Sequence, residues 1–313
     1  MSSYTVLAPG VLSLLQDLGR FGQAALGLTT GGPMDPQSAY WANRLLSNPQ
    51  GSTLIECSIG GLQLKANGSS YIAVTGANAA LTINGKAAQA WTTHKVSNGD
   101  VIELAMASQG LRCYLAVAGG FDVKPQFGST STVLREGIGG LNGNKLQAGD
   151  SLPAAQVTSL PRLQLPVQYR PQFNRILTLR LIEGYQAASF ASTERQRFYL
   201  NSYQVTPQAD RMGYKLKGSA IRCQQSQLLS EGICYGAVQI PPDGQPIVLL
   251  NDRQTLGGYP KIGSVLSLDC ALLSQAGAGV EVYFTPISAE QAHNALCLAK
   301  VRTDAITSQL VTL

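Results

Sequence analysis

Charged residues are scarce in this chain of 313 residues: they make up 13% of it, about half of the share that soluble domains usually carry. The 23 lysines and arginines are scattered and form no basic run, so the net charge of +5 does not indicate a nucleic-acid-binding surface. No apolar run is as long as a membrane span. The first residues have neither the basic nor the apolar region of a signal peptide. We therefore expect a cytoplasmic globular protein that binds neither nucleic acid nor membrane.

Histidine is nearly absent, and the cysteines are far apart. Only His94 and His293 occur, and no two of the six cysteines form a Cys-x-x-Cys pair. A nucleophilic cysteine needs a base beside it, usually a histidine, and neither histidine lies in a motif that suggests such a pair. We therefore expect free, mostly buried thiols in a reducing compartment, and no metal site. The cysteines are Cys57, Cys113, Cys223, Cys234, Cys270 and Cys297.

The chain has 33 glycines and many short apolar or alternating runs, which predict a mainly β fold with a few helices. Asn84-Gly85 and Asn98-Gly99 are dipeptides typical of hairpin turns. Asp35 and Ser288 are suited to cap helices over residues 36–46 and 288–301. A third helix is expected over residues 186–200. The strands with the clearest pattern are residues 70–76, 80–85, 100–104 and 112–118.

Residues 152–171 are rich in proline and have no clear periodicity. Such a segment is typical of a linker between domains. It divides the chain into a predicted N-terminal domain, residues 1–165, and a predicted C-terminal domain, residues 172–313.

A dense polar cluster follows an apolar strand in the C-terminal third. Residues 247–250 are apolar, residues 251–255 are polar, and Gly-Gly-Tyr-Pro follows at 257–260. Polar groups at the end of a buried strand can hold a small polar ligand on a rigid scaffold. Asp252 is suited to orient or deprotonate an amide, and Gln254 to hydrogen-bond a lactam or ureido group. The alternative is a polar turn that Asp252 stabilises.

Upstream of this cluster, Arg211 and Tyr214 add a cation and a phenol. The planar fork of an arginine can bind a carboxylate through two hydrogen bonds. The alternative for Arg211 is a surface arginine beside a buried methionine and a buried tyrosine, Met212 and Tyr214.

Two polar segments in the N-terminal half also need an interpretation. Asp17 and Arg20 either line a polar pocket together with Gln16 or form an ion pair across a turn. The four hydroxyls of residues 129–132 are able to bind a carboxylate or a phosphate, but such a run is more often a solvated loop.

A glycine-rich segment at residues 137–146 lacks the Gly-Lys-Ser/Thr of a Walker loop and the spacing of a dinucleotide fingerprint. The chain also has no Met-Lys-Met segment, the usual context of a biotinylated lysine. No motif in this chain therefore binds a cofactor. If ATP or biotin takes part in its chemistry, we expect the cofactor on another chain.

Six segments together resemble a known family, the biotin-dependent carboxyltransferases, also called the allophanate hydrolase subunit 2 family. They occur in the order typical of that family, and the resemblance covers nearly the whole chain. The segments are residues 16–20, 31–35, 42–46, 114–120, 211–214 and 252–260.

The resemblance implies two cyclophilin-like β-barrel subdomains. For a separate chain of this length, it implies the C-type subunit of an ATP-dependent complex that hydrolyses 5-oxoproline to L-glutamate. The implied partners are an A-type subunit and a B-type subunit that is similar to a sporulation-kinase inhibitor. Two alternatives stay open: a carboxyltransferase component that moves carboxylate from biotin to urea or a related amide, and a regulatory partner of the B-type subunit without turnover.

The resemblance also implies a set of site residues. One departure from the family's pattern is Asn144, where an arginine is common; Lys145 beside it is only a partial substitute, because an ammonium lacks the planar fork. The implied catalytic residues are Asp252, Gln254 and Tyr214. The implied substrate-binding residues are Arg211, Tyr259, Gly257 and Gly258, with Asp17 and Arg20 as weaker members.

Overall fold

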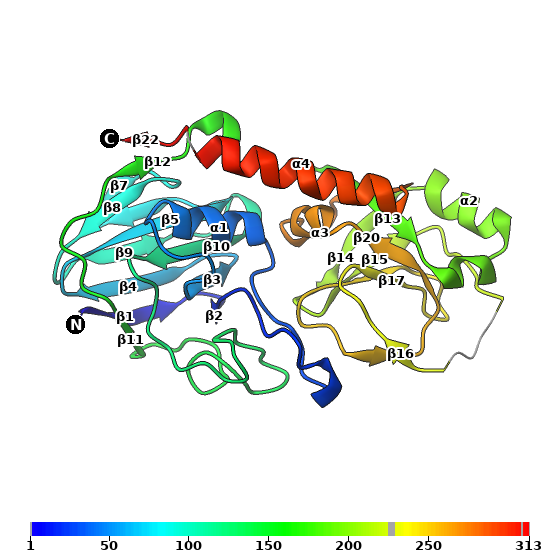
Figure 1. Ribbon diagram of the computed structural model, residues 1–313, viewed down its shortest axis with the longest axis horizontal. Helices are drawn as coiled ribbons and strands as arrows, with labels where there is room; N and C mark the ends of the chain where they lie inside the picture. The colour runs from blue at the N-terminus through cyan, green and yellow to red at the C-terminus, as the bar shows by residue number, and fades with distance from the viewer. Residues whose placement is uncertain (1, 225–228, 308, 313) are drawn as a thin grey trace. The chain divides into compact units, whose positions relative to one another are not determined.

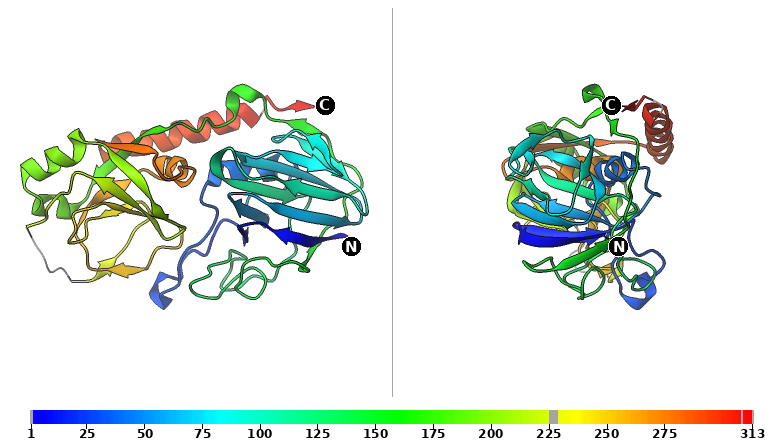
Figure 2. Two further views of the ribbon diagram at one scale, coloured as in Figure 1. Left: turned by 180° about the vertical axis from the view of Figure 1, so that it is seen from behind. Right: turned by 90° about the vertical axis from the view of Figure 1, so that its left-hand side faces the viewer.

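A computed structural model describes residues 2–224, 229–307 and 309–312, and the chain divides into two compact units. Unit 1 consists of Met1–Gly22, Thr30–Gln172 and Ala305–Leu313. Unit 2 consists of Gln23–Thr29 and Phe173–Asp304. The units are therefore not two consecutive segments, since the last residues of the chain return to the first unit. Both described ends of the chain, β1 and β22, lie in unit 1 (Figures 1 and 2).

Unit 1 is built from two antiparallel sheets whose apolar faces enclose one core. The core takes alternate residues from both sheets, such as Val6 and Leu64 from one and Leu15 and Ile55 from the other. The six-stranded sheet has the order β11 (Ser151–Ala154), β1 (Ser2–Pro9), β4 (Leu62–Asn67), β9 (Val101–Leu104), β6 (Leu81–Ile83) and β7 (Lys86–Ala88). The five-stranded sheet has the order β2 (Leu12–Gln16), β3 (Leu54–Ser58), β10 (Gln109–Val117), β5 (Ser70–Asn78) and β8 (Thr93–Val96).

The helix α1 (Pro36–Arg44) covers the outer face of the five-stranded sheet and lies across β5 and β10 (Figure 1). The predicted cap is confirmed, because the Asp35 carboxylate accepts a hydrogen bond from the backbone N–H of Ser38 at 3.1 Å. Ala39 and Ala42 pack on the sheet. Since β5 and β10 are covered on both faces, most of their residues are buried in continuous runs instead of alternately.

The short strands β12 (Leu163–Gln164) and β22 (Val311–Thr312) pair with each other, and this pairing holds the C-terminal segment in unit 1. Ile306 packs beside Trp41, Trp91 and Leu165 in a small separate cluster. A one-turn helix, η2 (Val167–Tyr169), lies in the proline-rich segment.

Unit 2 is a closed barrel of seven strands. Its strands are antiparallel except for β13 and β21, which run parallel and close the barrel. The order is β13 (Ile176–Glu183), β20 (Lys261–Val265), β17 (Ala237–Gln239), β18 (Ile247–Leu249), β15 (Gly213–Gly218), β14 (Tyr203–Ala209) and β21 (Glu281–Pro286). A two-stranded ribbon, β16 (Glu231–Gly232) and β19 (Leu256–Gly257), accompanies it.

The helices of unit 2 are η1 (Ala24–Leu26), η3 (Tyr185–Ser189), α2 (Ser192–Leu200), α3 (Ser267–Ser274) and most of α4 (Ala289–Thr307). The prediction of one helix over 186–200 is wrong. The backbone of Phe190 is extended and pairs with Cys223, which buries the phenyl ring and separates η3 from α2. The predicted start of α4 is confirmed: Gln291 donates its N–H to the Ser288 hydroxyl and accepts the N–H of Ser288.

The mainly β prediction is confirmed, but the two turn dipeptides have different outcomes. Asn84 and Gly85 both have positive φ and join β6 to β7 in a hairpin, as expected. Asn98-Gly99 lies between β8 and β9, which belong to different sheets, so it makes a turn between sheets and not a hairpin. The residues of a turn determine how tightly the chain reverses. Which sheet the next strand joins depends on how the apolar side chains of that strand pack in the core. In the described residues, no helix has both the length and the apolar character needed to cross a membrane.

Candidate functional site

The polar cluster after β18 contains a buried ion pair between Arg211 and Asp252. The two side chains meet through two hydrogen bonds, Nε to Oδ2 and Nη2 to Oδ1, each 2.8 Å long. The two residues are only 5% and 6% exposed. The backbone N–H of Asp252 also donates to the Arg211 carbonyl at 2.9 Å. The structure thus brings these two predicted site residues together, and the carboxylate that occupies the arginine fork is that of Asp252.

Tyr214 lies on β15, one of the strands of the barrel. It is fully buried, and its hydroxyl donates to the Ser274 carbonyl, at the end of α3, at 3.0 Å. Burial of this kind gives the phenol a role in joining β15 to α3.

Gln254 and the glycine turn lie beside a polar side chain that the sequence did not reveal, Gln239 on β17. Gln239 is buried, and its Nε2 has no hydrogen-bond partner among the described residues. Gln254 Nε2 lies 3.5 Å from Gln239 Oε1. A Cβ added at Gly257 would lie 2.8 Å from Gln239 Nε2, so a larger residue there would displace the end of the Gln239 side chain. The available signal was a glutamine within the otherwise apolar run 237–240.

Two further predicted residues of the turn, Gly258 and Tyr259, lie near the surface. Gly258 is half-buried, and Tyr259 is 49% exposed. Nearby, Arg253 donates from Nε to the Ile233 carbonyl at 3.1 Å and from Nη1 to the Leu250 carbonyl at 3.2 Å. These bonds commit the Arg253 guanidinium to the backbone.

In unit 1, Asp17 and Arg20 both bind the loop of residues 126–132. The Asp17 carboxylate accepts from the hydroxyls of Ser129 and Ser131 at 2.5 and 2.7 Å and from the N–H of Thr130 at 2.8 Å. Burial raises the pKa of Asp17, but these hydrogen bonds outweigh it and hold the pKa below its usual value. Arg20 is 1% exposed and donates to carbonyls of the same loop, including that of Gln126 at 3.0 Å.

The prediction of a solvated loop at residues 129–132 is therefore wrong. All four residues are buried. The hydroxyls of Ser129 and Ser131 bind the Asp17 carboxylate, whereas the Thr132 hydroxyl donates to the Leu15 carbonyl and the Thr130 hydroxyl lies 2.8 Å from that of Thr53. A run of hydroxyls does not show by itself whether its partner is water or a carboxylate of the same chain.

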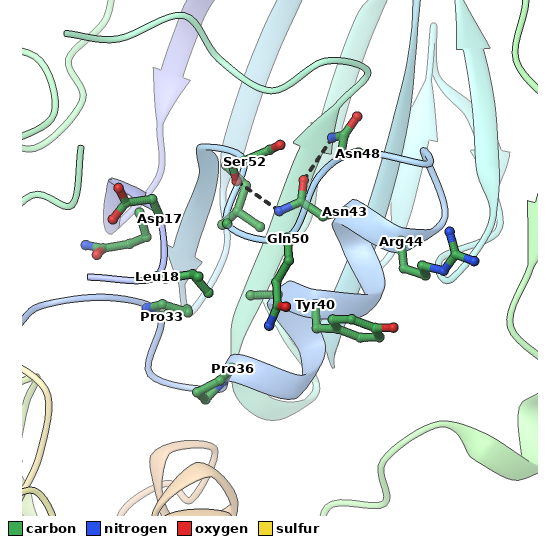
Figure 3. A pocket seen from close by; sticks show the side chains of 14 residues that line it. Asp17, Leu18, Pro33, Pro36, Tyr40, Asn43, Arg44, Asn48, Gln50 and Ser52 are labelled. Carbon is green, nitrogen blue, oxygen red and sulfur yellow. Dashed lines mark hydrogen bonds between the residues drawn. The ribbon is translucent and has the colours of Figure 1, made fainter. Parts of the chain in front are cut away.

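A pocket of about 310 Å³ opens beside Asp17, over α1 and the segment that leads into β3 (Figure 3). Leu18 and Pro33 lie at one end, Arg44 lies at the other end beyond Tyr40, and Gln50 extends between them (Figure 3). Three of the six segments that carry the family resemblance line this pocket, namely 16–20, 31–35 and 42–46. The lining residues are Gln16, Asp17, Leu18, Pro33, Pro36, Ala39, Tyr40, Asn43, Arg44, Asn48, Gln50, Gly51, Ser52 and Leu54.

The floor of this pocket is a fixed network of amide groups. Asn43 donates to the Ser52 carbonyl at 2.9 Å and accepts from Asn48 at 2.8 Å (Figure 3). Gln16 donates to the Thr132 carbonyl at 3.0 Å and accepts the N–H of Gly32 at 3.1 Å. These bonds hold the floor rigid and commit its amides to the protein itself.

Comparison with known proteins places the chain in a family. Residues 26–286 match the family model described as carboxyltransferase domain, subdomain A and B. The chain belongs to this family. It is 35% identical to the 5-oxoprolinase C subunit of Escherichia coli (strain K12) over 290 residues, which are 92% of each protein. It is 36% identical to the protein of the same name from Haemophilus influenzae over 279 residues, which are 89% of each.

Solved structures agree with this family assignment. The chain superposes on the crystal structure of the K. lactis urea amidolyase with a TM-score of 0.90 and 26% identity, over 97% of its own length but 20% of that enzyme. It is 35% identical to the protein in the crystal structure of TTHA0988, with a TM-score of 0.83 over 91% of its own length and 56% of that chain. The carboxyltransferase fold therefore occurs both as a separate subunit and as part of longer enzymes.

Proposed function

We propose that this chain is the C subunit of an ATP-dependent 5-oxoprolinase, which hydrolyses 5-oxoproline to L-glutamate together with A-type and B-type subunits. The observation that carries the proposal is the match in both identity and length: about nine tenths of this chain aligns with about nine tenths of two proteins named as the C subunit of 5-oxoprolinase. The carboxyltransferase fold alone would not separate this function from others in the family.

The chemistry explains why such an enzyme consumes ATP. A lactam is an amide, and its resonance makes the carbonyl carbon a poor electrophile. Transfer of the γ-phosphoryl group to the lactam oxygen releases ADP and activates that carbon. Addition of one water and cleavage of the C–N bond gives an acyl phosphate, and a second water releases phosphate and glutamate. ATP belongs, in this proposal, to the nucleotide site of a partner subunit.

A second function is favoured by a specific observation, the TM-score of 0.90 to the urea amidolyase. In that alternative the chain is the carboxyltransferase component of a biotin-dependent enzyme, and the biotin is carried by another chain.

The test is ATP-dependent release of glutamate from 5-oxoproline by this chain purified together with its A-type and B-type partners. We expect glutamate only when all three subunits are present. The control omits this chain, and a second control replaces ATP with a non-hydrolysable analogue. A well-formed complex that releases no glutamate, but transfers carboxylate from biotin to urea when a biotin carrier is added, would replace the proposal with the alternative.

A further inference from the structure

The pocket over α1 has the dimensions and the walls of a small-molecule site. Its volume of about 310 Å³ lies at the lower end of the range of such sites, which begins at roughly 300 Å³. Leu18, Pro33, Pro36, Ala39 and Leu54 give it apolar walls. Because these residues come from separate segments of the chain, the pocket exists only in the folded unit.

Most polar side chains that line the pocket are already committed to the protein. This holds for the two amides of the floor, for Gln16 and for the Asp17 carboxylate, as described above. The Tyr40 hydroxyl lies 3.3 Å from that of Thr307, and the Ser52 hydroxyl donates to the Pro49 carbonyl at 3.0 Å.

Two polar side chains of the pocket remain, Arg44 and Gln50. Within the described part of the chain, neither side chain makes a hydrogen bond or an ion pair. A guanidinium offers a planar fork of donors, and a carboxamide offers one acceptor beside one donor. These two groups are the ones with capacity left for a ligand.

Arg44 also has a purely structural explanation. It lies in the last turn of α1, where a cation stabilises the partial negative charge of the helix end. A lysine would serve that purpose as well, but it would not reproduce the fork. Comparing the two residues therefore separates the structural role from a binding role.

We propose that this pocket binds a small carboxylate-bearing cyclic amide, with Arg44 on the carboxylate and Gln50 on the amide. The carboxamide of Gln50 pairs with the adjacent N–H and C=O of the ring, and the apolar walls contact its methylene groups. 5-Oxoproline has this combination of groups, so the inference deepens the proposed function and rests on it for the identity of the ligand.

The charges at the two ends of the pocket fix the orientation of such a ligand. Asp17 lies near Leu18 and stays ionised. Burial raises its pKa, but its hydrogen bonds lower the pKa by more, so that the pKa is below its usual value. A carboxylate is therefore repelled from that end and attracted to Arg44 at the other (Figure 3). Arg211 does not compete for this role, since its fork holds Asp252.

The test is calorimetric titration of 5-oxoproline into the assembled complex and into this chain alone. We expect Arg44→Gln to weaken binding roughly tenfold or more, because the charge-assisted bidentate contact is lost. Arg44→Lys should weaken binding less, because the charge remains although the bidentate geometry does not. Gln50→Ala is expected to weaken binding severalfold. Arg162→Gln is the matched control, since Arg162 is an exposed arginine of unit 1 that lies outside the pocket.

Two ligand analogues assign each contact. 2-Pyrrolidinone lacks the carboxylate, so its weaker binding should be insensitive to Arg44→Gln. Proline lacks the lactam carbonyl, so its binding should be insensitive to Gln50→Ala. A structural role for Arg44 would change the melting temperature but would not produce this pattern.

Several results would overturn the inference. One is the absence of 5-oxoproline binding in both samples, and another is an equal affinity of wild type and Arg44→Gln. A third is loss of binding in Gln254→Ala with full affinity in Arg44→Gln, which would place the ligand at the barrel instead. Failure of the proposed function is distinguishable: a complex that binds 5-oxoproline through Arg44 but releases no glutamate contradicts the function and not the pocket. A complex that releases glutamate with an unchanged KM in Arg44→Gln contradicts the pocket and not the function.

Discussion

Removal of one partner of the Arg211–Asp252 pair should destabilise unit 2 strongly. Each residue is at most 6% exposed, and two 2.8 Å hydrogen bonds join them. Arg211→Met leaves the Asp252 carboxylate buried without its cation, which typically costs about 3–5 kcal/mol. For a unit of this size we expect the melting temperature to fall by roughly 10–20 °C. The double variant Arg211→Met/Asp252→Leu removes both charges and should recover most of that loss.

The assay is urea unfolding of the four members of this double-mutant cycle, followed by circular dichroism, because both tryptophans, Trp41 and Trp91, lie in unit 1. Lys215 and Asp243 provide the matched control, because their ion pair in the same unit has the same 2.8 Å distance but is exposed to solvent. Asp243→Asn should cost at most about 1 kcal/mol. Arg211→Met with an unchanged free energy of unfolding, together with a loss of 5-oxoproline turnover, would refute the reasoning and return Arg211 to the role of a substrate clamp.

Two further predictions concern titratable groups. The pKa of Asp17 is lowered in the fold, so its carboxylate stabilises the protein above its unfolded pKa of about 4, and this contribution is lost as pH falls through the folded pKa. The difference in unfolding free energy between wild type and Asp17→Asn, measured in urea, should be constant above about pH 5 and shrink below about pH 4. A difference that keeps its full size down to about pH 2 would contradict this. Burial raises the pKa of Cys113 to about 12, whereas Cys234 and Cys297 are exposed, so a disulfide reagent at pH 7.5 should modify the latter two first. Rapid reaction of Cys113 in the folded chain would show that the core opens readily.

The sequence predicted best those features that depend on short stretches of chain. The caps at Asp35 and Ser288 and the hairpin turn at Asn84-Gly85 were found, because a cap or a tight turn is decided by a few adjacent residues. The mainly β character followed in the same way from local periodicity. The prediction of free thiols holds, although only Cys57, Cys113 and Cys270 are fully buried.

The candidate site could be predicted only in part, because only the folded structure shows whether a charged side chain pairs with another side chain or is available to a ligand. Arg211 and Asp252 were both selected from the sequence, but nothing in two segments 41 residues apart shows that they satisfy one another. Asp17 was selected as well, without its partners in the loop more than a hundred residues away. Arg44 lies in the family segment 42–46, but one arginine in a helix carries no local sign of the pocket beside it.

The pairing of β12 with β22 has a consequence for the synthesis of the chain. The partners Gln164 and Val311 are 147 residues apart, because the barrel of unit 2 is made between them. At translation rates of about 5–20 residues per second, β12 leaves the ribosome on the order of ten seconds before its partner exists. Leu165 is translated 141 residues before its packing partner Ile306, and Trp91 and Trp41 are translated earlier still. Unit 1 is thus the first part of the protein to be translated and the last to be completed. A chain that is truncated shortly before Ile306 contains every strand of the barrel but lacks the segment that completes unit 1.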